Sequence, residues 1–234
     1  MKQELFTIEE LHEAYKDCIK NKKSSKDYLE YELKHQKRDL VKLLEEVNTK
    51  TYKVWKSYCF IAYKPKIREI FAAGFRDRIV HHLVIWLIED YFEKRFINNV
   101  FSCRKWKWAL LGVKTLFENL QKVDNNSYYL QLDLKWFFSN IDKEILFNLT
   151  NKHLKKKNFK QYRVLRYLIK EIIFNDPVKW VEKRWNLSLY KQVANSKSLF
   201  FKPKSKWLPI WNLTSQFFAN IYLNELDNYI YWLL

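Results

Sequence analysis

The chain is almost without glycine. Gly74 and Gly112 are its only glycines among 234 residues, whereas an average usage of roughly 7% would give about 16. Turns, bulges and helix ends need residues that tolerate a positive φ, which glycine adopts without steric cost. Tryptophan occurs 10 times instead. A compact fold of this chain therefore has to place bulky residues where glycine is usual.

The rest of the composition is that of a basic globular protein. Hydrophobic residues make up 48% of the chain, which excludes the disordered class. The net charge is +17. An excess of lysine is common in proteins that bind phosphate backbones, so we favour nucleic acid as the partner over the alternative of a merely soluble basic surface.

The sequence also indicates a compartment. An odd number of cysteines, with no signal region at the N-terminus, fits a reducing cytoplasm. The longest apolar run, 79–89, contains His81 and His82 and is too short to span a bilayer, so no membrane partner is expected. The cysteines lie far apart and show no zinc-ligand spacing: Cys18, Cys59 and Cys103.

Hydrophobic periodicity predicts segregated helices and a few strands, which is an α+β fold. Thr7 and Glu10 form a capping box at the first helix, and Thr214 is the expected N-cap of the last. We expect hairpins and loops over 175–207. The other expected helices cover 27–47, 75–97, 109–123, 140–159 and 161–173, and the expected strands are two around a basic turn in 58–73 and a buried one over 128–134.

Asp133 is the first candidate for chemistry. It ends the apolar stretch 128–134, where a lone carboxylate is costly unless it is paired or bound to a metal. The plainer alternative is an aspartate that caps the next turn. Phe138 follows five residues later, just before a predicted helix. A carboxylate on a rigid strand beside a nucleotide is what Mg²⁺-dependent phosphoryl transfer needs.

Three cations alternate in "KPKIRE": Lys64, Lys66 and Arg68. Alternate residues of a strand share one face. Three cations on one face repel one another unless they meet an anion such as a triphosphate. The alternative is a solvated basic edge that discourages aggregation.

Two further stretches could bind nucleic acid or nucleotide. "CRKWKW" alternates basic and aromatic residues, which suits stacking on single-stranded bases; its cations are Arg104, Lys105 and Lys107. Ser215 and Gln216 begin the last predicted helix, where backbone N–H groups can face a phosphate or a base.

Four blocks, in chain order, resemble the bacterial reverse transcriptases. "KPKIREIFAAGFRDRIVHHLV" resembles the fingers motifs and "FINNVFSCRKWKWALLGV" the next block. "YYLQLDLKWFFSNIDKEIL" resembles the palm motif with the first catalytic aspartate, and "SKSLFFKPKSKWLPIWNLTSQFFANIYLNELD" the motif beneath the incoming nucleotide. "TSQ" is similar to the enzymes of diversity-generating retroelements, although retron and group II intron enzymes share much of the pattern.

The resemblance implies an RNA-directed DNA polymerase with a right-hand fold and two Mg²⁺ ions. Its expected partners are an RNA template, a DNA primer and dNTPs, with an accessory protein of the element as a further candidate. The implied parts are a helical N-terminal segment (1–50), fingers (51–125) and a partial palm (126–234).

The resemblance also implies a role for each candidate residue. Asp133 would bind both metal ions with help from the Leu134 carbonyl. Phe138 would be the steric gate that excludes a ribose 2′-OH. Lys66 and Arg68 would contact the triphosphate. The nucleotide and templating base would lie near Ile210, Ser215 and Gln216, and the template backbone near Lys64, Arg104, Lys105 and Lys107.

One departure from the family concerns tryptophan. The blocks would read "CRKGKG", "DLKGFF" and "KGLPIGNLTSQ" if glycine stood where this chain has tryptophan. Our hypothesis is that UGA codons that the host reads as glycine have been translated as tryptophan. The positions concerned are Trp106, Trp108, Trp136, Trp185, Trp207 and Trp211, with Trp55 and Trp180 as further candidates and Trp86 and Trp232 left open.

The second departure is that the family's Tyr-x-Asp-Asp turn and thumb are not in these 234 residues. Asp133 alone cannot hold two ions, and Asp142 and Asp227 lie on predicted helices as poor substitutes. We therefore expect no polymerisation by these residues alone. A non-catalytic, basic RNA-binding module is the alternative function, whereas a purely structural helical protein leaves the ordered blocks unexplained.

Overall fold

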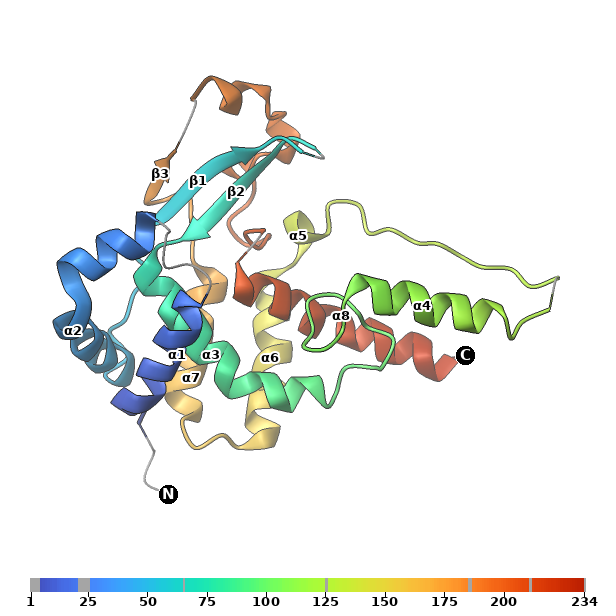
Figure 1. Cartoon of the computed structure of the whole chain (residues 1–234), viewed down its shortest axis with the longest axis horizontal. Coiled ribbons are helices and arrows are strands. Elements are labelled where there is room, and N and C mark those ends of the chain that lie inside the picture. Colours follow the sequence, from blue (N-terminus) through green and yellow to red (C-terminus); the bar gives the residue numbers. More distant parts are fainter. Residues whose placement is uncertain are drawn as a thin grey trace.

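The computed structural model describes residues 5–20, 26–64, 66–124, 126–184, 187–210 and 212–233, without the side chains of 26–27, 30 and 33–37 (Figure 1). It is an α+β fold, as predicted. Its elements are α1 (Ile8–Ile19), α2 (Lys26–Asn48), β1 (Ser57–Ala62), β2 (Arg68–Ala73), α3 (Phe75–Glu93), α4 (Ala109–Leu120), α5 (Phe137–Asn140), α6 (Lys143–Lys157), α7 (Tyr162–Phe174), β3 (Val181–Lys183), the 3-10 turns Leu187–Gln192, Asn195–Lys197 and Leu199–Phe201, and α8 (Leu213–Leu233).

A helical body surrounds α3. We use this name for α1, α2, α3, α6, α7 and the first half of α8, which pack on one another around α3. Because α3 is apolar on most of its circumference, it must be buried on most sides, and Ile79, Leu83 and Ile88 are fully enclosed. The predicted capping box is confirmed at α1, where the Glu10 N–H donates to Thr7 Oγ1 at 3.2 Å and the Thr7 N–H donates to Glu10 Oε2 at 2.9 Å.

The sheet is small and mixed. β1 and β2 form the predicted antiparallel hairpin, with Ser57 opposite Ala73, and β3 pairs with β1 in parallel. The predicted alternation of three cations along one strand is wrong, because Lys64 and Lys66 lie in the turn of the hairpin and only Arg68 is on a strand. The expected hairpin after β3 does not form among the described residues, which continue as 3-10 turns.

The predicted buried strand over 128–134 is wrong. The segment is extended and pairs with no described strand, and Tyr128, Leu130 and Leu132 are 77–100% exposed. An extended segment without a neighbour cannot form a ladder and cannot enclose its side chains. Figure 1 shows that α4 and this segment project away from the helical body; we call residues 109–124 and 126–136 the arm.

The last helix begins at Leu213, one residue before the predicted N-cap. Thr214 lies inside it and is buried, with its Oγ1 3.5 Å from Nδ1 of His81 on α3. His81 is therefore a core residue. No helix in the described part of the chain is long and apolar enough to cross a membrane.

Candidate functional site

One pocket gathers residues that are far apart in the sequence. It has a volume of about 300 Å³, and we call it the site pocket. Lys66 and Arg68 reach it from the β1–β2 hairpin, Phe138 from α5 and Ile210 from the segment before α8. These are four of the residues expected near a nucleotide. The rest of the lining is Ile67, Glu69, Trp136, Phe137, Ser139, Val193, Lys197, Leu199 and Leu208.

Backbone hydrogen bonds join the two chain segments that supply many of the apolar side chains of the site pocket. The N–H of Leu208 donates to the Phe138 carbonyl at 2.8 Å, and the N–H of Trp207 donates to the Ile141 carbonyl at 2.8 Å. The N–H of Lys143 donates to the Ser205 carbonyl at 3.1 Å. Residues 205–208 are thus joined to the α5–α6 connection, which places Ile210 near Phe138.

The polar wall of the site pocket is mainly cationic. Lys66, Arg68 and Lys197 line it, with one carboxylate, Glu69. Glu69 is buried and accepts a hydrogen bond from the Leu199 N–H at 2.9 Å, and burial raises its pKa. A pocket with cations on one wall and apolar side chains on the other suits a ligand with an anionic part and a flat apolar part.

The other predicted nucleotide residues lie outside this pocket. Ser215 is buried and lines a smaller cavity beside His81, and Gln216 is half-buried in the first turn of α8. Leu208 lines both cavities, so Ser215 stands on the far side of the site pocket's wall.

Asp133 does not join the site pocket. It and Leu134 are exposed on the extended segment of the arm. Among the described residues, no three His, Cys, Asp or Glu side chains come together in a way that could hold a metal ion. The residues that the structure describes therefore do not fit the two Mg²⁺ ions that the resemblance implies.

The cations of "CRKWKW" are largely engaged by the protein itself. The Arg104 side chain is 5% exposed and donates to Glu93 Oε2 at 2.9 Å and to the Ile97 carbonyl at 2.7 Å. Lys105 is paired with Glu89, and Lys107 donates to the Asn98 carbonyl. Arg104 therefore attaches this loop to α3 and does not face solvent. Lys64, the fourth residue expected near the template backbone, is exposed at the turn of the β1–β2 hairpin.

Two residues near the site were not predicted to matter. Lys197 enters the pocket from a 3-10 turn, and nothing in the local sequence marks it. Lys143 is 1% exposed, its Nζ donates to the Asn175 carbonyl at 2.9 Å, and it lies 4.0 Å from the Trp207 ring centroid. Burial lowers the pKa of Lys143 to about 8.

The tryptophans fall into two conformational groups. Trp106, Trp136 and Trp207 have φ of 62°, 54° and 81°, in the left-handed region that strongly favours glycine. Both glycines of the chain lack a positive φ. Trp108 has an ordinary φ of −123°, and Trp185 and Trp211 lie outside the described residues.

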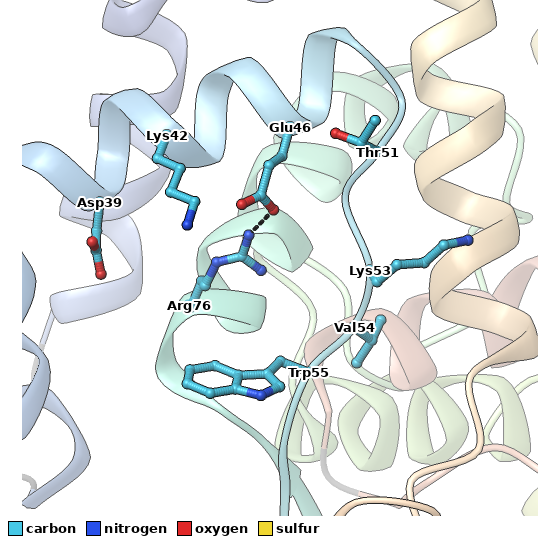
Figure 2. A pocket seen from close by; sticks show the side chains of 8 residues that line it. All are labelled: Asp39, Lys42, Glu46, Thr51, Lys53, Val54, Trp55 and Arg76. Carbon is cyan, nitrogen blue, oxygen red and sulfur yellow. Dashed lines mark hydrogen bonds and ion pairs between the residues drawn. The ribbon is translucent and has the colours of Figure 1, made fainter.

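A second cavity, of about 630 Å³, lies beside α2 and the segment that leads to β1. Figure 2 shows Arg76 reaching Glu46 at its centre and the Trp55 indole along one side. Lys53 is 2.8 Å from Glu171. Because its central cation is paired with a carboxylate, this cavity attracts an anion less than the site pocket does.

Comparison with known proteins adds no relative from which a function could be inferred. No protein-family model matches the chain, and no curated protein matches it.

Proposed function

We propose that this chain is the nucleotide- and RNA-binding part of a reverse transcriptase of the type found in diversity-generating retroelements, retrons and group II introns. In this proposal 1–50 form a helical N-terminal segment, 51–125 the fingers and 126–234 part of the palm. The observation that carries the proposal is the site pocket, because Lys66, Arg68, Phe138 and Ile210 converge there from separate segments.

The proposed ligand of the site pocket is a deoxynucleoside triphosphate. Lys66 and Arg68 would bind the phosphates through charge-assisted hydrogen bonds. Phe138 would lie against the sugar, where its ring leaves no room for a 2′-OH, and Ile210 would contact the flat face of the base. RNA would bind to the basic surface that includes Lys64, with a DNA primer as the second strand.

In the full reaction the primer 3′-OH would attack the α-phosphate of the dNTP, and pyrophosphate would leave as the new bond forms. That step needs carboxylates in addition to Asp133. The role proposed for the residues of this chain is therefore to bind and position the dNTP and the nucleic acid. Partners beyond template, primer and dNTP would include an accessory protein of the element.

Nucleotide binding tests the proposal directly. We expect the Lys66→Ala, Arg68→Ala double variant to bind a fluorescent dATP analogue at least about tenfold more weakly than the unchanged protein, since two charge-assisted contacts are lost. Lys152→Ala, on the exposed face of α6, is the matched control and should change the affinity less than about twofold. Equal affinity in the double variant and the control would sink the proposal.

A non-catalytic RNA-binding module is the second candidate, and the position of Asp133 favours it. An exposed aspartate with no described carboxylate partners is not assembled for catalysis. Both functions predict RNA binding that weakens as salt rises. Primer extension separates them: incorporation by this chain that Asp133→Ala abolishes would rule out the non-catalytic function.

A further inference from the structure

We infer that Trp106, Trp136 and Trp207 occupy backbone positions that the fold builds for glycine, and that glycine at 136 is the residue that opens the site pocket to a phosphorylated ligand. The part about the backbone stands by itself. The part about the ligand rests on the proposed function.

The first two positions share a turn geometry. The Lys107 N–H donates to the Arg104 carbonyl at 3.3 Å, and the Phe137 N–H donates to the Leu134 carbonyl at 3.1 Å. Each bond closes a four-residue turn whose third residue is a tryptophan with positive φ. Turns of this kind take glycine at the third residue, because a side chain there meets the backbone.

Trp207 adds an independent sign of poor fit. It is 1% exposed, yet its indole N–H has no hydrogen-bond partner among the described residues. A buried donor without an acceptor is rare in folded proteins.

The conformations agree with the composition. The chain has 2 glycines and 10 tryptophans, and neither glycine has a positive φ. Tryptophan decoded in place of glycine accounts for the deficit, the excess and the strained backbone together. Trp86 serves as the control for these three positions, because it lies within α3, is 46% exposed and has no positive φ.

At 136 the indole also competes with a ligand. Trp136 lines the site pocket, and its ring holds Lys135 Nζ at 5.0 Å and Lys202 Nζ at 5.1 Å. Cation–π contacts of this kind occupy ammonium groups that a phosphate would otherwise bind. Lys135 and Lys202 do not line the pocket while the indole holds them, and its removal would let them turn toward an anion there.

The backbone requirement is tested by glycine and alanine at the same position, since both remove the indole and only glycine relieves a positive φ. We expect Trp106→Gly to melt about 2–4 °C above Trp106→Ala, with the same sign for the pair at 136. At 86 the order should reverse by a similar amount, because glycine weakens a helix interior. Equal melting of glycine and alanine variants at both 106 and 136 would overturn the inference.

Ligand binding tests the role of position 136, with inorganic triphosphate and dATP as probes. Trp136→Gly should bind both about tenfold more tightly than the unchanged protein, because two cation–π contacts no longer compete. Trp180→Gly, at an exposed tryptophan that does not line the pocket, should not. No gain at 136 overturns the ligand part. A glycine preference at 106 and 136 without dATP binding by any variant would support the backbone part and reject the proposed function.

Mass spectrometry of the protein isolated from its own host tests the decoding. Glycine in the peptides that contain 106, 136 and 207 is the expected result. Tryptophan at all three would overturn the decoding of tryptophan in place of glycine.

Discussion

The helical body and the arm are built from similar residues and bury them to very different extents. In the body, α3 encloses most of its apolar side chains. In the arm, α4 has no buried residue, although Leu110, Val113, Leu116, Phe117 and Leu120 are apolar. An amphipathic pattern thus creates a face that can be buried, and only a packing partner buries it.

Matched leucines give the largest expected contrast. Leu83 of α3 is 0% exposed and Leu116 of α4 is 59% exposed. We expect Leu83→Ala to lower the free energy of unfolding by about 2–5 kcal/mol, because it leaves a cavity, and Leu116→Ala to change it by less than about 0.5 kcal/mol. Urea denaturation measures both. Similar losses would mean that the arm is packed in solution and would end the contrast.

The second prediction concerns the stability of the body at acidic pH. His81 lies in the body, and its burial, with His82 and Arg78 nearby, lowers its pKa from 6.5 to about 3. The unfolded chain therefore binds a proton between pH 6.5 and 3 that the folded chain does not, so stability falls as the pH falls through this window. From pH 6.5 to 4.5 the loss should be about 2 kcal/mol.

His81→Gln isolates this effect. The raised pKa of buried Asp77 gives a slope of opposite sign, but it is present in both proteins and cancels in the difference. His82→Gln is the control, since His82 is the neighbouring, half-buried histidine. We expect the stability of His81→Gln to depend less on acid than that of His82→Gln. Parallel pH curves for the two variants would contradict this.

The third prediction concerns stability at alkaline pH and Lys143, which lies between the body and the site pocket. Burial holds the pKa of Lys143 at about 8, below its usual 10.5. Between these values the unfolded chain binds the extra proton, so stability rises with pH. We expect a gain of about 1–2 kcal/mol between pH 8 and 9.5.

Lys143→Met keeps the length of the side chain and removes its charge. The alkaline gain should disappear in this variant, and its stability at pH 7 should equal or exceed that of the unchanged protein, because an apolar side chain needs no buried partner. Chemical denaturation at several pH values measures both. A gain of the same size in Lys143→Met would show that another group titrates.

Local signals in the sequence predicted those elements that local chemistry determines. The capping box of Thr7 and Glu10, the β1–β2 hairpin and α3 are examples, since each depends on neighbouring residues. The prediction of a buried strand over 128–134 was wrong, because an apolar stretch carries no information about a partner strand.

The candidate site divides in the same way. The pattern of the blocks brought Lys66, Arg68, Phe138 and Ile210 to attention, and they share a pocket. The burial of Lys143 depends on contacts with residues 175 and 205–207, so it could not be predicted from the sequence around it. The positive φ of Trp136 is a property of a turn, and only the glycine deficit hinted at it.

The smallest contrast is between two ion pairs, one that joins α3 of the body to the loop before the arm and one within the arm. Arg104 and Glu93 pair at 2.9 Å with side chains 5% and 20% exposed, whereas Lys114 and Glu118 of α4 lie 3.8 Å apart and are 71% and 53% exposed. In the arm, water and salt screen the charges. The lysine also precedes the glutamate, which is the weaker order for such a pair on a helix.

A double-mutant cycle with Lys114→Ala and Glu118→Ala should therefore give a coupling free energy of at most about 0.5 kcal/mol, and less at high salt. Loss of the Arg104–Glu93 pair should destabilise the protein more, because Glu93→Ala leaves the buried Arg104 guanidinium without its carboxylate. Such a change costs about 3–5 kcal/mol. A coupling above about 1 kcal/mol in α4 would mean that the pair is shielded from solvent. The face of α4 that carries Lys114 and Glu118 would then be covered in solution, and the arm would resemble the body after all.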